Sequence, residues 1–377
     1  MKVEQSKRTI DGWVIPPMGK LKEKAQWVLV FGSPAMLTDQ KSLLAVQAAY
    51  PAAQIMGCST AGEICDVHVA DETLVVTAVY FEHTRLEIAH AEANHIRQSG
   101  FAGEALGRVL NQSGLTHVFV LSDGLTVNGS ELVNGLMRQL PAKVAVTGGL
   151  AGDGVRFRRT YVSINGESRP NYVSAVGFYG NHLKVGYGSV GGWDPFGAEW
   201  TITRSEGSIL YELDGISALN LYKRYLGDEV AGLPASALLF PLSLEVPGAD
   251  QPVVRTILAV DETNGTMTFA GDMPVGARAR LMKANFERLV EGANTAAKIS
   301  RGENDTPADL AILISCVGRK LVLKQRVEEE VETVREMLGP AAVMTGFYSY
   351  GEISPFKPGV RCALHNQTMT VTTFTEI

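Results

Sequence analysis

AQIMGCSTAGEI, residues 53–64, joins a short apolar strand pattern to a glycine-rich loop that ends in glutamate and isoleucine. Before it come a buried-type strand, VLVFG (28–32), and an amphipathic helix pattern at 39–50. After it comes the long apolar run TLVVTAVYF (73–81). Because strand and helix patterns alternate in this way, the sequence predicts an α/β fold of mixed sheets with helices.

The same order of patterns returns near the C-terminus. A strand pattern LAILISC (310–316) and a helix pattern (323–338) precede the loop GFYSYGEI (346–353) and the final strand TMTVTTF (368–374). A weaker copy between them has a loop one residue shorter, GLAGD (149–153), which ends in aspartate. The copies are too unevenly spaced for a solenoid. The sequence therefore predicts two related lobes that contain duplicated β-α-β-Gly/Glu-loop-β units.

Residues 181–309 show a different pattern of strand and helix signals. An Asn-Gly pair at 264–265 lies between two alternating apolar runs, 253–260 and 266–271, which is a strong signal for a β-hairpin. The run from about 279 to 299 is amphipathic, and we interpret it as one long helix.

The composition excludes several classes of protein. A chain of 377 residues predicts two or three domains at roughly 150 residues each. The formal charge of −6 argues against a nucleic-acid binder, whose footprint is basic. No apolar run reaches about 18 residues, so no membrane insertion is expected, and the N-terminus lacks the apolar region of a signal peptide. Four cysteines do not form a disulfide framework in a chain this long. We expect a cytoplasmic protein.

The glycine-rich loops are the first candidate ligand-binding site. Glycine lets the backbone approach a ligand closely, and the acid after the second glycine can orient a ligand amine. The predicted ligand-binding residues in the two Gly/Glu loops are Gly57, Gly62, Glu63, Gly346, Gly351 and Glu352. The alternative is that each loop is a structural turn whose glutamate caps backbone amides. No Gly-Lys-Ser/Thr follows either loop, so they are not phosphate-binding P-loops.

The run RCALHNQT (361–368) contains the second candidate. On a strand, Cys362 and His365 point to opposite faces, so they make a poor nucleophile–base pair. His365 alone remains a candidate metal or haem ligand, and a hydrogen-bonded structural role is the alternative. His68, just after the first loop, is the second candidate ligand. Neither CxxC nor HExxH is present, so zinc is not expected.

A cluster of arginines follows the third loop. Arg156 and Arg158 would share one face of a strand and could hold a carboxylate, including a haem propionate. The alternative is an exposed strand edge that carries charge.

Taken together, these features resemble the FIST family of bacterial sensory proteins. The resemblance covers nearly the whole chain from about residue 25, and the motifs that carry it are WVLVFGS (27–33), GCSTAGEI (57–64), TGGLAGDG (147–154), TMTFAGDMPVGARARLM (266–282), TGFYSYGEISP (345–355) and ALHNQT (363–368). It implies an N-terminal segment (1–24), a FIST N-like domain (25–215) and a FIST C-like domain (216–377).

The resemblance implies a sensory ligand-binding protein and not an enzyme. Some stand-alone members of the family are haem proteins that sense nitric oxide and regulate a histidine kinase. By that resemblance we expect haem b, with His365 of the ALHNQT motif as the iron ligand and His68 as the second candidate. Output would pass through a separate partner, a sensor histidine kinase of a two-component system or a cyclase of cyclic-di-GMP signalling.

Two alternatives stay open beside the haem-based nitric oxide sensor. One is a FIST sensor for an organic small molecule such as an amino acid, with the Gly/Glu loops clamping its ammonium group. The other is a thiol-dependent hydrolase that uses Cys58 or Cys362.

Overall fold

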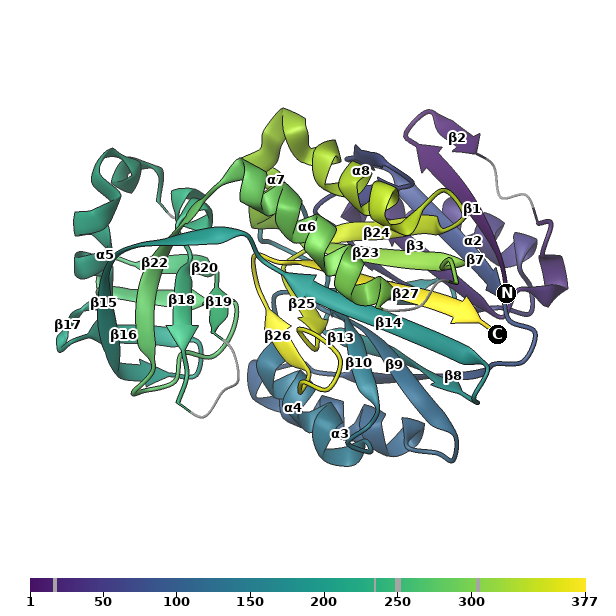
Figure 1. Ribbon diagram of the computed structural model, residues 1–377, viewed down its shortest axis with the longest axis horizontal. Coiled ribbons are helices and arrows are strands. Elements are labelled where there is room, and N and C mark those ends of the chain that lie inside the picture. Colours follow the sequence, from purple (N-terminus) through teal and green to yellow (C-terminus); the bar gives the residue numbers. More distant parts are fainter. Residues whose placement is uncertain (16–18, 234, 248–251, 303–305) are drawn as a thin grey trace.

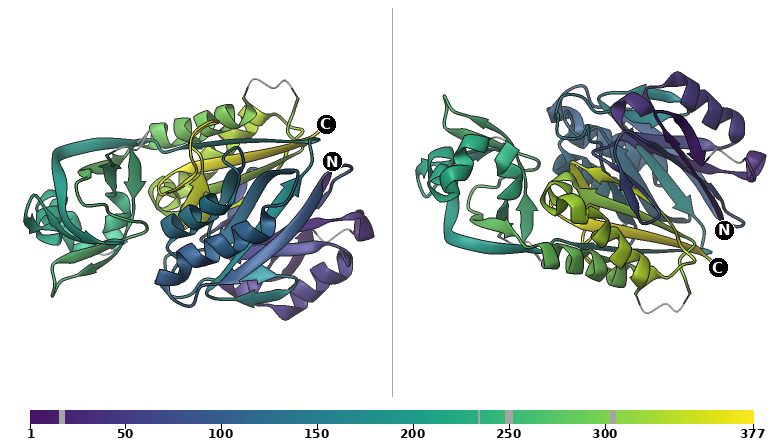
Figure 2. Two further views of the ribbon diagram at one scale, coloured as in Figure 1. Left: turned by 90° about the horizontal axis from the view of Figure 1, so that it is seen from below. Right: turned by 90° about the horizontal axis from the view of Figure 1, so that it is seen from above.

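The fold is that of a computed structural model, which describes residues 1–15, 19–233, 235–247, 252–302 and 306–377. Three mixed sheets with their helices form a body, and a fourth, eight-stranded sheet system stands at one end of it (Figure 1). We call residues 193–284 the inserted module. Both views of Figure 2 show this module set apart from the body. The predicted α/β class with mixed sheets is confirmed.

The first repeated unit has the predicted β-α-β form. Its elements are β3 (Trp27–Gly32), α1 (Pro34–Leu37), α2 (Gln40–Ala49), β4 (Gln54–Ser59) and β7 (Leu74–Tyr80). Strand β3 is central and fully buried, and it pairs in parallel with β4 and antiparallel with β7. Asp39 begins α2 because its side chain accepts a hydrogen bond from the Lys41 N–H.

The other two units repeat this arrangement. The second consists of β9 (Leu115–Ser122), α4 (Gly129–Gln139), β10 (Ala145–Leu150) and β13 (Tyr172–Tyr179). The third consists of β23 (Leu310–Cys316), α7 (Val317–Leu323), α8 (Val327–Leu338), β24 (Val343–Ser349) and β27 (Met369–Glu376). In each, the first strand pairs in parallel with the second and antiparallel with the last. The weaker copy in the sequence is therefore a complete unit.

Each unit sends a hairpin into the sheet of another unit. The hairpins are β5 (Glu63–Cys65) with β6 (His68–Ala70), β11 (Val162–Ile164) with β12 (Glu167–Arg169), and β25 (Gly351–Ser354) with β26 (Ala363–His365). Strand β5 pairs with β24, β11 with β4, and β25 with β10. The exchange is cyclic, so each of the three sheets contains strands from two units.

The remaining elements of the body complete these sheets and cover them. They are β1 (Lys2–Thr9), β2 (Gly12–Ile15), β8 (Arg85–Glu92), α3 (Ser99–Leu110), β14 (Leu183–Val190) and α6 (Phe286–Arg301). Strands β1, β8 and β14 extend the three units beside β7, β13 and β27. The pairing of β14 with β27 joins the predicted N-terminal domain to the C-terminal strand.

One aromatic core is shared by the three units. The indole of Trp27 meets the rings of Phe119, Phe178 and Phe374 at centroid distances of 5.8, 5.2 and 6.0 Å. All four side chains are fully buried. Because such large side chains provide much of the free energy of folding, the units stabilise one another.

The inserted module enters the chain between β14 and α6. Its elements are β15 (Trp193–Glu206), β16 (Ile209–Leu213), β17 (Ile216–Ser217), α5 (Ala218–Leu226), β18 (Leu242–Glu245), β19 (Val253–Arg255), β20 (Ile257–Asp261), β21 (Thr266–Phe269) and β22 (Arg278–Ala284). The predicted hairpin at the Asn-Gly pair is confirmed, since β20 pairs with β21 around it. The module has a hydrophobic core of its own.

The predicted single helix from 279 to 299 is wrong at its start. Residues 278–284 form strand β22, whose side chains alternate between buried and exposed, as a half-buried strand requires. Helix α6 begins only at Phe286, after Asn285 caps it by accepting a hydrogen bond from the Arg288 N–H. Within the described residues, no helix combines the length and the apolarity needed to cross a membrane.

Candidate functional site

The three glycine-rich loops are joined in a ring of backbone hydrogen bonds. In each case a loop N–H donates to a carbonyl of a neighbouring unit: Ala61 to Tyr348 (2.8 Å), Gly152 to Ser59 (2.8 Å) and Tyr350 to Leu150 (3.2 Å). The ring follows from the cyclic exchange of hairpins, because each hairpin leaves its unit at such a loop. The structure therefore brings together the loops that the sequence aligned.

The first glycine of each loop has a packing role. A Cβ atom at Gly57 would lie 2.0 Å from the carbonyl oxygen of Val30, and one at Gly346 would lie 1.8 Å from that of Leu313. Gly351 is similarly enclosed, with the Leu364 side chain 2.9 Å from its Cβ position. Side chains do not fit at such distances, so these glycines allow adjacent strands to approach closely.

Glu63 is held by hydroxyl and amide donors of its own unit. Its carboxylate accepts hydrogen bonds from the Thr73 N–H (2.9 Å), the Thr73 hydroxyl (2.6 Å) and the Thr60 hydroxyl. The residue is 1% exposed. Burial raises its pKa to about 7, against the opposing effect of these hydrogen bonds. Glu63 is therefore poised between its neutral and charged forms near neutral pH.

Glu352 repeats this arrangement in the third unit. It accepts hydrogen bonds from the Thr368 N–H (3.1 Å), the Thr368 hydroxyl (3.0 Å) and the Ser349 hydroxyl (2.6 Å). Burial raises its pKa to about 8. Both glutamates thus accept hydrogen bonds from backbone and hydroxyl donors, as the structural alternative in the sequence analysis predicted. Of the two, only Glu63 lines the cavity described next.

A cavity of about 470 Å³ opens beside the first loop, and we call it the loop pocket. The first unit contributes Gly62 and Glu63, the second contributes Arg156, and the third contributes Lys320 and Lys324. Gly62 has a φ of 138°, a backbone conformation that favours glycine, and a Cβ atom there would lie 2.5 Å from Lys320 Nζ. Three predicted site residues, Gly62, Glu63 and Arg156, therefore meet in one cavity.

The loop pocket carries charges of both signs. Lys320 Nζ donates to the Ala61 carbonyl (2.9 Å) and forms an ion pair with Asp71. Arg156 forms a looser pair with Glu72, with 3.6 Å between nitrogen and oxygen. Both acidic partners also line the cavity. A small ligand with a cationic and an anionic group finds a partner for each here.

Arg158 does not join this site. The expected strand is absent from residues 156–159, which fold as a loop around Asp153 because its carboxylate accepts hydrogen bonds from three backbone N–H groups, those of Phe157, Arg158 and Arg159. The Arg158 side chain is exposed and lies outside the lining of the loop pocket. The expected shared strand face of Arg156 and Arg158 is wrong for this reason.

His365 is a buried residue with a local partner. Its Nε2 lies 2.7 Å from the Ser354 carbonyl oxygen, and its ring meets that of Phe356 at 4.1 Å between centroids. Burial lowers its pKa to about 4, so the ring is neutral. An axial haem ligand needs a free ring nitrogen facing an open slot, whereas Nε2 is occupied and Phe356 covers the ring. These residues do not fit a haem bound through His365.

His68 lies on the surface, where its side chain is 68% exposed and its Nδ1 is 3.4 Å from Glu328 Oε1. An axial haem ligand lies in an enclosed apolar slot, so a side chain this exposed does not fit that role. Within the described ranges, no three His, Cys, Asp or Glu residues are grouped as a metal site would require.

The two candidate thiols are buried. Burial raises the pKa of Cys58 well above its usual value and also raises that of Cys362. The Cys362 Sγ donates to the Val146 carbonyl at 3.1 Å. A thiol nucleophile needs a lowered pKa and access to substrate, and this arrangement supplies neither.

Lys320 is a pocket residue that the sequence did not predict, because the helix of the third unit was expected to begin at residue 323. Residues 317–323 form α7, whose first turns place Lys320 over the first loop. The run VGRKLVL follows the strand without a proline, and its one glycine, Gly318, stands at the second position. This continuity was the available signal for an earlier start of the helix.

Two family descriptions match the chain. The FIST N domain matches residues 26–216 and the FIST C domain matches residues 218–355. An uncharacterised protein of Mycobacterium tuberculosis strain H37Rv is 23% identical over 348 residues, covering 90% of this chain and 88% of the relative. An uncharacterised protein of Methanocaldococcus jannaschii is 24% identical over 308 residues, covering 75% of this chain and 58% of the relative.

Among solved structures, a cyanuric acid hydrolase from A. caulinodans aligns with 100% of this chain and 98% of its own. The identity is 8% and the TM-score is 0.34, values too low to support an argument about fold or activity.

Proposed function

This chain belongs to the FIST family, and we propose that it is a sensory protein that binds a zwitterionic organic molecule, such as an amino acid, in the loop pocket. The observation that carries the proposal is the meeting of three basic and three acidic side chains from all three units around one cavity. A cavity of about 470 Å³ lies within the range of small-molecule sites.

The charges assign a role to each side of the ligand. Lys320 and Arg156 already hold carboxylates, those of Asp71 and Glu72. A ligand carboxylate takes the place of one of these partners, and its ammonium group then pairs with the carboxylate that is released. Exchange of one ion pair for another keeps the charges of the pocket compensated.

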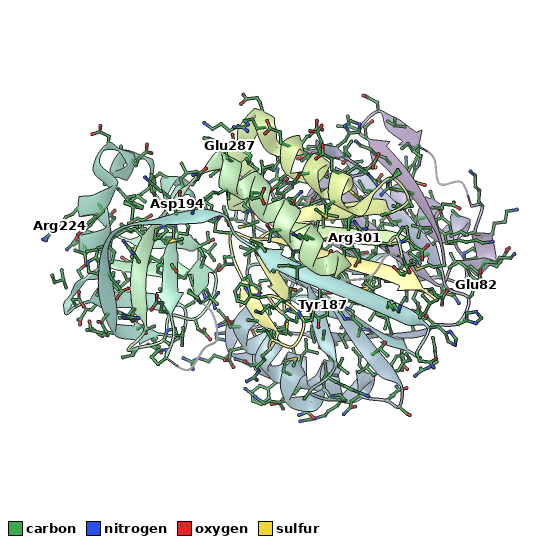
Figure 3. All side chains as sticks on the ribbon, in the orientation of Figure 1. Glu82, Tyr187, Asp194, Arg224, Glu287 and Arg301 are labelled. Atoms are coloured by element: carbon green, nitrogen blue, oxygen red, sulfur yellow. The ribbon has the colours of Figure 1, made fainter. Side chains whose placement is uncertain are left out.

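Arg319 connects the helix of the loop pocket to the chain segments that lead into and out of the inserted module. It is the neighbour of Lys320 on α7, and its fully buried guanidinium pairs with Glu330 at 2.7 Å. The same guanidinium donates to the carbonyls of Gly191 and Leu289. Those carbonyls flank the two chain crossings between body and module. Figure 3 labels Asp194, which lies just beyond the first crossing, and Glu287, which lies just beyond the second. We propose that movement of α7 on binding reaches the module through this contact.

We also propose an output partner for this sensory protein. A sensory role implies a protein that receives the signal, and we propose a histidine kinase or a cyclic-di-GMP cyclase acting in trans. The inserted module, with its own core and its contact to α7, is the surface that we assign to this partner.

The test is a thermal-shift screen of the twenty amino acids, each beside its amide and its N-acetyl derivative. We expect at least one amino acid to raise Tm, because a ligand that binds only the folded state stabilises it. Both derivatives, which lack one charge, should lose most of the shift. An equal shift by the singly charged derivatives would contradict a zwitterion site.

Haem binding at His365 or His68 stays a prediction that this geometry does not favour. An absorption spectrum of protein expressed with haem supply tests it directly. A Soret band that moves with nitric oxide and disappears in His365→Ala would contradict the organic-ligand proposal.

A further inference from the structure

A second cavity, also of about 470 Å³, lies between the inserted module and the body. We call it the arginine pocket. Arg255 and Asp272 line it from the module, Val133 of α4 lines it from the second unit, and Leu364 of β26 lines it from the third. It shares no residue with the loop pocket.

Arg255 is a buried cation with unused hydrogen-bonding capacity. It is 7% exposed. Its Nη1 donates to the carbonyls of Leu364 (3.0 Å) and Val254 (3.4 Å), and its Nε donates to that of Asp272 (3.4 Å). Among the residues that the structure describes, Nη2 has no hydrogen-bond partner and Arg255 forms no ion pair. The Asp272 carboxylate attracts Arg255 electrostatically but forms no ion pair with it. A buried guanidinium without a directly bonded anion is costly, so an anion in this cavity would be favoured.

The other charged groups of the cavity leave an excess of positive charge. Arg361 lines the outer wall, is exposed, and likewise forms no ion pair with any described residue. Among the described residues of the lining, Asp272 carries the one carboxylate, which accepts a hydrogen bond from Asn128 Nδ2 at 2.7 Å. Two guanidinium groups of the described lining therefore face one carboxylate.

The uncharged residues of the lining indicate the chemistry of the rest of the ligand. The Ser130 Oγ is buried and lacks a hydrogen-bond partner within the described chain, so it is available as a donor. The walls beside it are apolar, formed by Val133, Val253, Phe356 and Leu364. One spare positive charge, one spare hydroxyl and apolar walls suit a small apolar body that carries a single carboxylate.

We propose that the arginine pocket binds a monocarboxylate with a compact apolar body. One carboxylate oxygen accepts from Arg255 Nη2, Ser130 Oγ or Arg361 completes the coordination, and the body of the ligand lies against the valine, leucine and phenylalanine side chains. Guanidinium groups recognise carboxylates through directed, charge-assisted hydrogen bonds. Because the lining comes from both module and body, the ligand fixes one against the other.

Titration with benzoate, followed by methyl NMR of labelled valine and leucine, tests the proposal on the full chain. We expect saturable shifts of the Val133, Val253 and Leu364 methyl signals, and none of comparable size with benzamide, the neutral isostere. Arg255→Gln should raise the Kd for benzoate by about tenfold or more, which is the loss of one charged hydrogen bond. Lys320→Met, in the loop pocket, should leave it unchanged.

Arg255 also supports the backbone of Leu364, so a second variant guards against loss of folding. Arg361 is exposed, and Arg361→Ala should weaken benzoate binding about two- to fivefold with an unchanged Tm, as expected for loss of a partly screened charge. Absence of shifts with benzoate, equal shifts with benzamide, or wild-type affinity in both arginine variants would each overturn the proposal.

Discussion

At the scale of single residues, equivalent positions of the repeated loops serve different purposes. Glu63 and Glu352 are held by the same set of donors, an N–H and a hydroxyl of one threonine and a hydroxyl three residues earlier. Only Glu63 also lines the loop pocket. Both glutamates therefore accept hydrogen bonds from backbone and hydroxyl donors, and Glu63 is in addition available to a ligand.

The cap in the third unit makes stability depend on pH. Glu352 ionises near pH ~4.3 in the unfolded chain, whereas burial raises its native pKa to about 8. Between these values the native state binds more protons than the unfolded state, so the free energy of unfolding falls as pH rises through this window. Above the native pKa this group causes no further fall. The slope from one such group reaches about 1.4 kcal/mol per pH unit.

We predict that Glu352→Gln, which imitates the neutral carboxyl, flattens this fall between about pH 5 and 8. Denaturant unfolding at half-unit pH intervals measures it. The exposed Glu332 on α8 provides the control, because Glu332→Gln should keep the wild-type slope. Identical slopes for Glu352→Gln and wild type would show that Glu352 is not held neutral in the native state.

At the scale of elements, α7 and α8 are joined by a buried ion pair whose arginine also holds the two segments that flank the module. The side chains of Arg319 and Glu330 are both fully buried, and Glu330 accepts further hydrogen bonds from Ser315 (3.0 Å) and Tyr348 (2.6 Å). Removal of one partner leaves the other charge buried and uncompensated.

We predict that Arg319→Leu lowers the free energy of unfolding by about 3–5 kcal/mol. It should also speed hydrogen–deuterium exchange around Gly191, whose carbonyl loses its donor. Arg326→Ala, which breaks exposed ion pairs at the start of α8, should cost about 1 kcal/mol or less. Similar losses in the two variants would contradict the role given to Arg319.

The sequence predicts individual strands better than their partners. The strand at 310–316 is correct to the residue, because a continuous run of β-branched and apolar residues favours a buried strand. Residues 279–284 were assigned to a helix, since a short alternating run joined to an amphipathic helix fits both periods. The exchange of hairpins could not be predicted, because β5 is only three residues long and its partner β24 lies far away in the chain.

The residues of the candidate site likewise include some that the sequence could predict and some that it could not. Gly62, Glu63 and Arg156 could be predicted from the loops, since loop chemistry is local. Lys320 and Arg255 could not, because each reaches its cavity only after α7 or the inserted module packs against another unit.

At the scale of the whole molecule, the three units form one folding body. Strands β5, β11 and β25 each complete another unit's sheet, and Trp27, Phe119 and Phe374 bring one ring from each unit into the shared core. A break in the chain near residue 215 separates strands from their partners.

We therefore predict that a fragment of residues 1–215 does not fold cooperatively. It lacks β24 and β27, the partners of β5 and β14, and it exposes the aromatic core. Circular dichroism during urea unfolding measures this, with the full chain as the control. A sharp two-state transition of the fragment would show that the predicted FIST N-like domain is independent.

The most direct test of the account is a calorimetric titration with the amino acid that gives the largest thermal shift. We predict one strong site per chain in the loop pocket, weakened about tenfold or more in Lys320→Met, since a charge-assisted hydrogen bond is lost. Arg158→Gln, an exposed arginine of the same region outside the pocket, should bind as the wild type does. Wild-type affinity in Lys320→Met, or no amino acid that binds at all, would contradict the account.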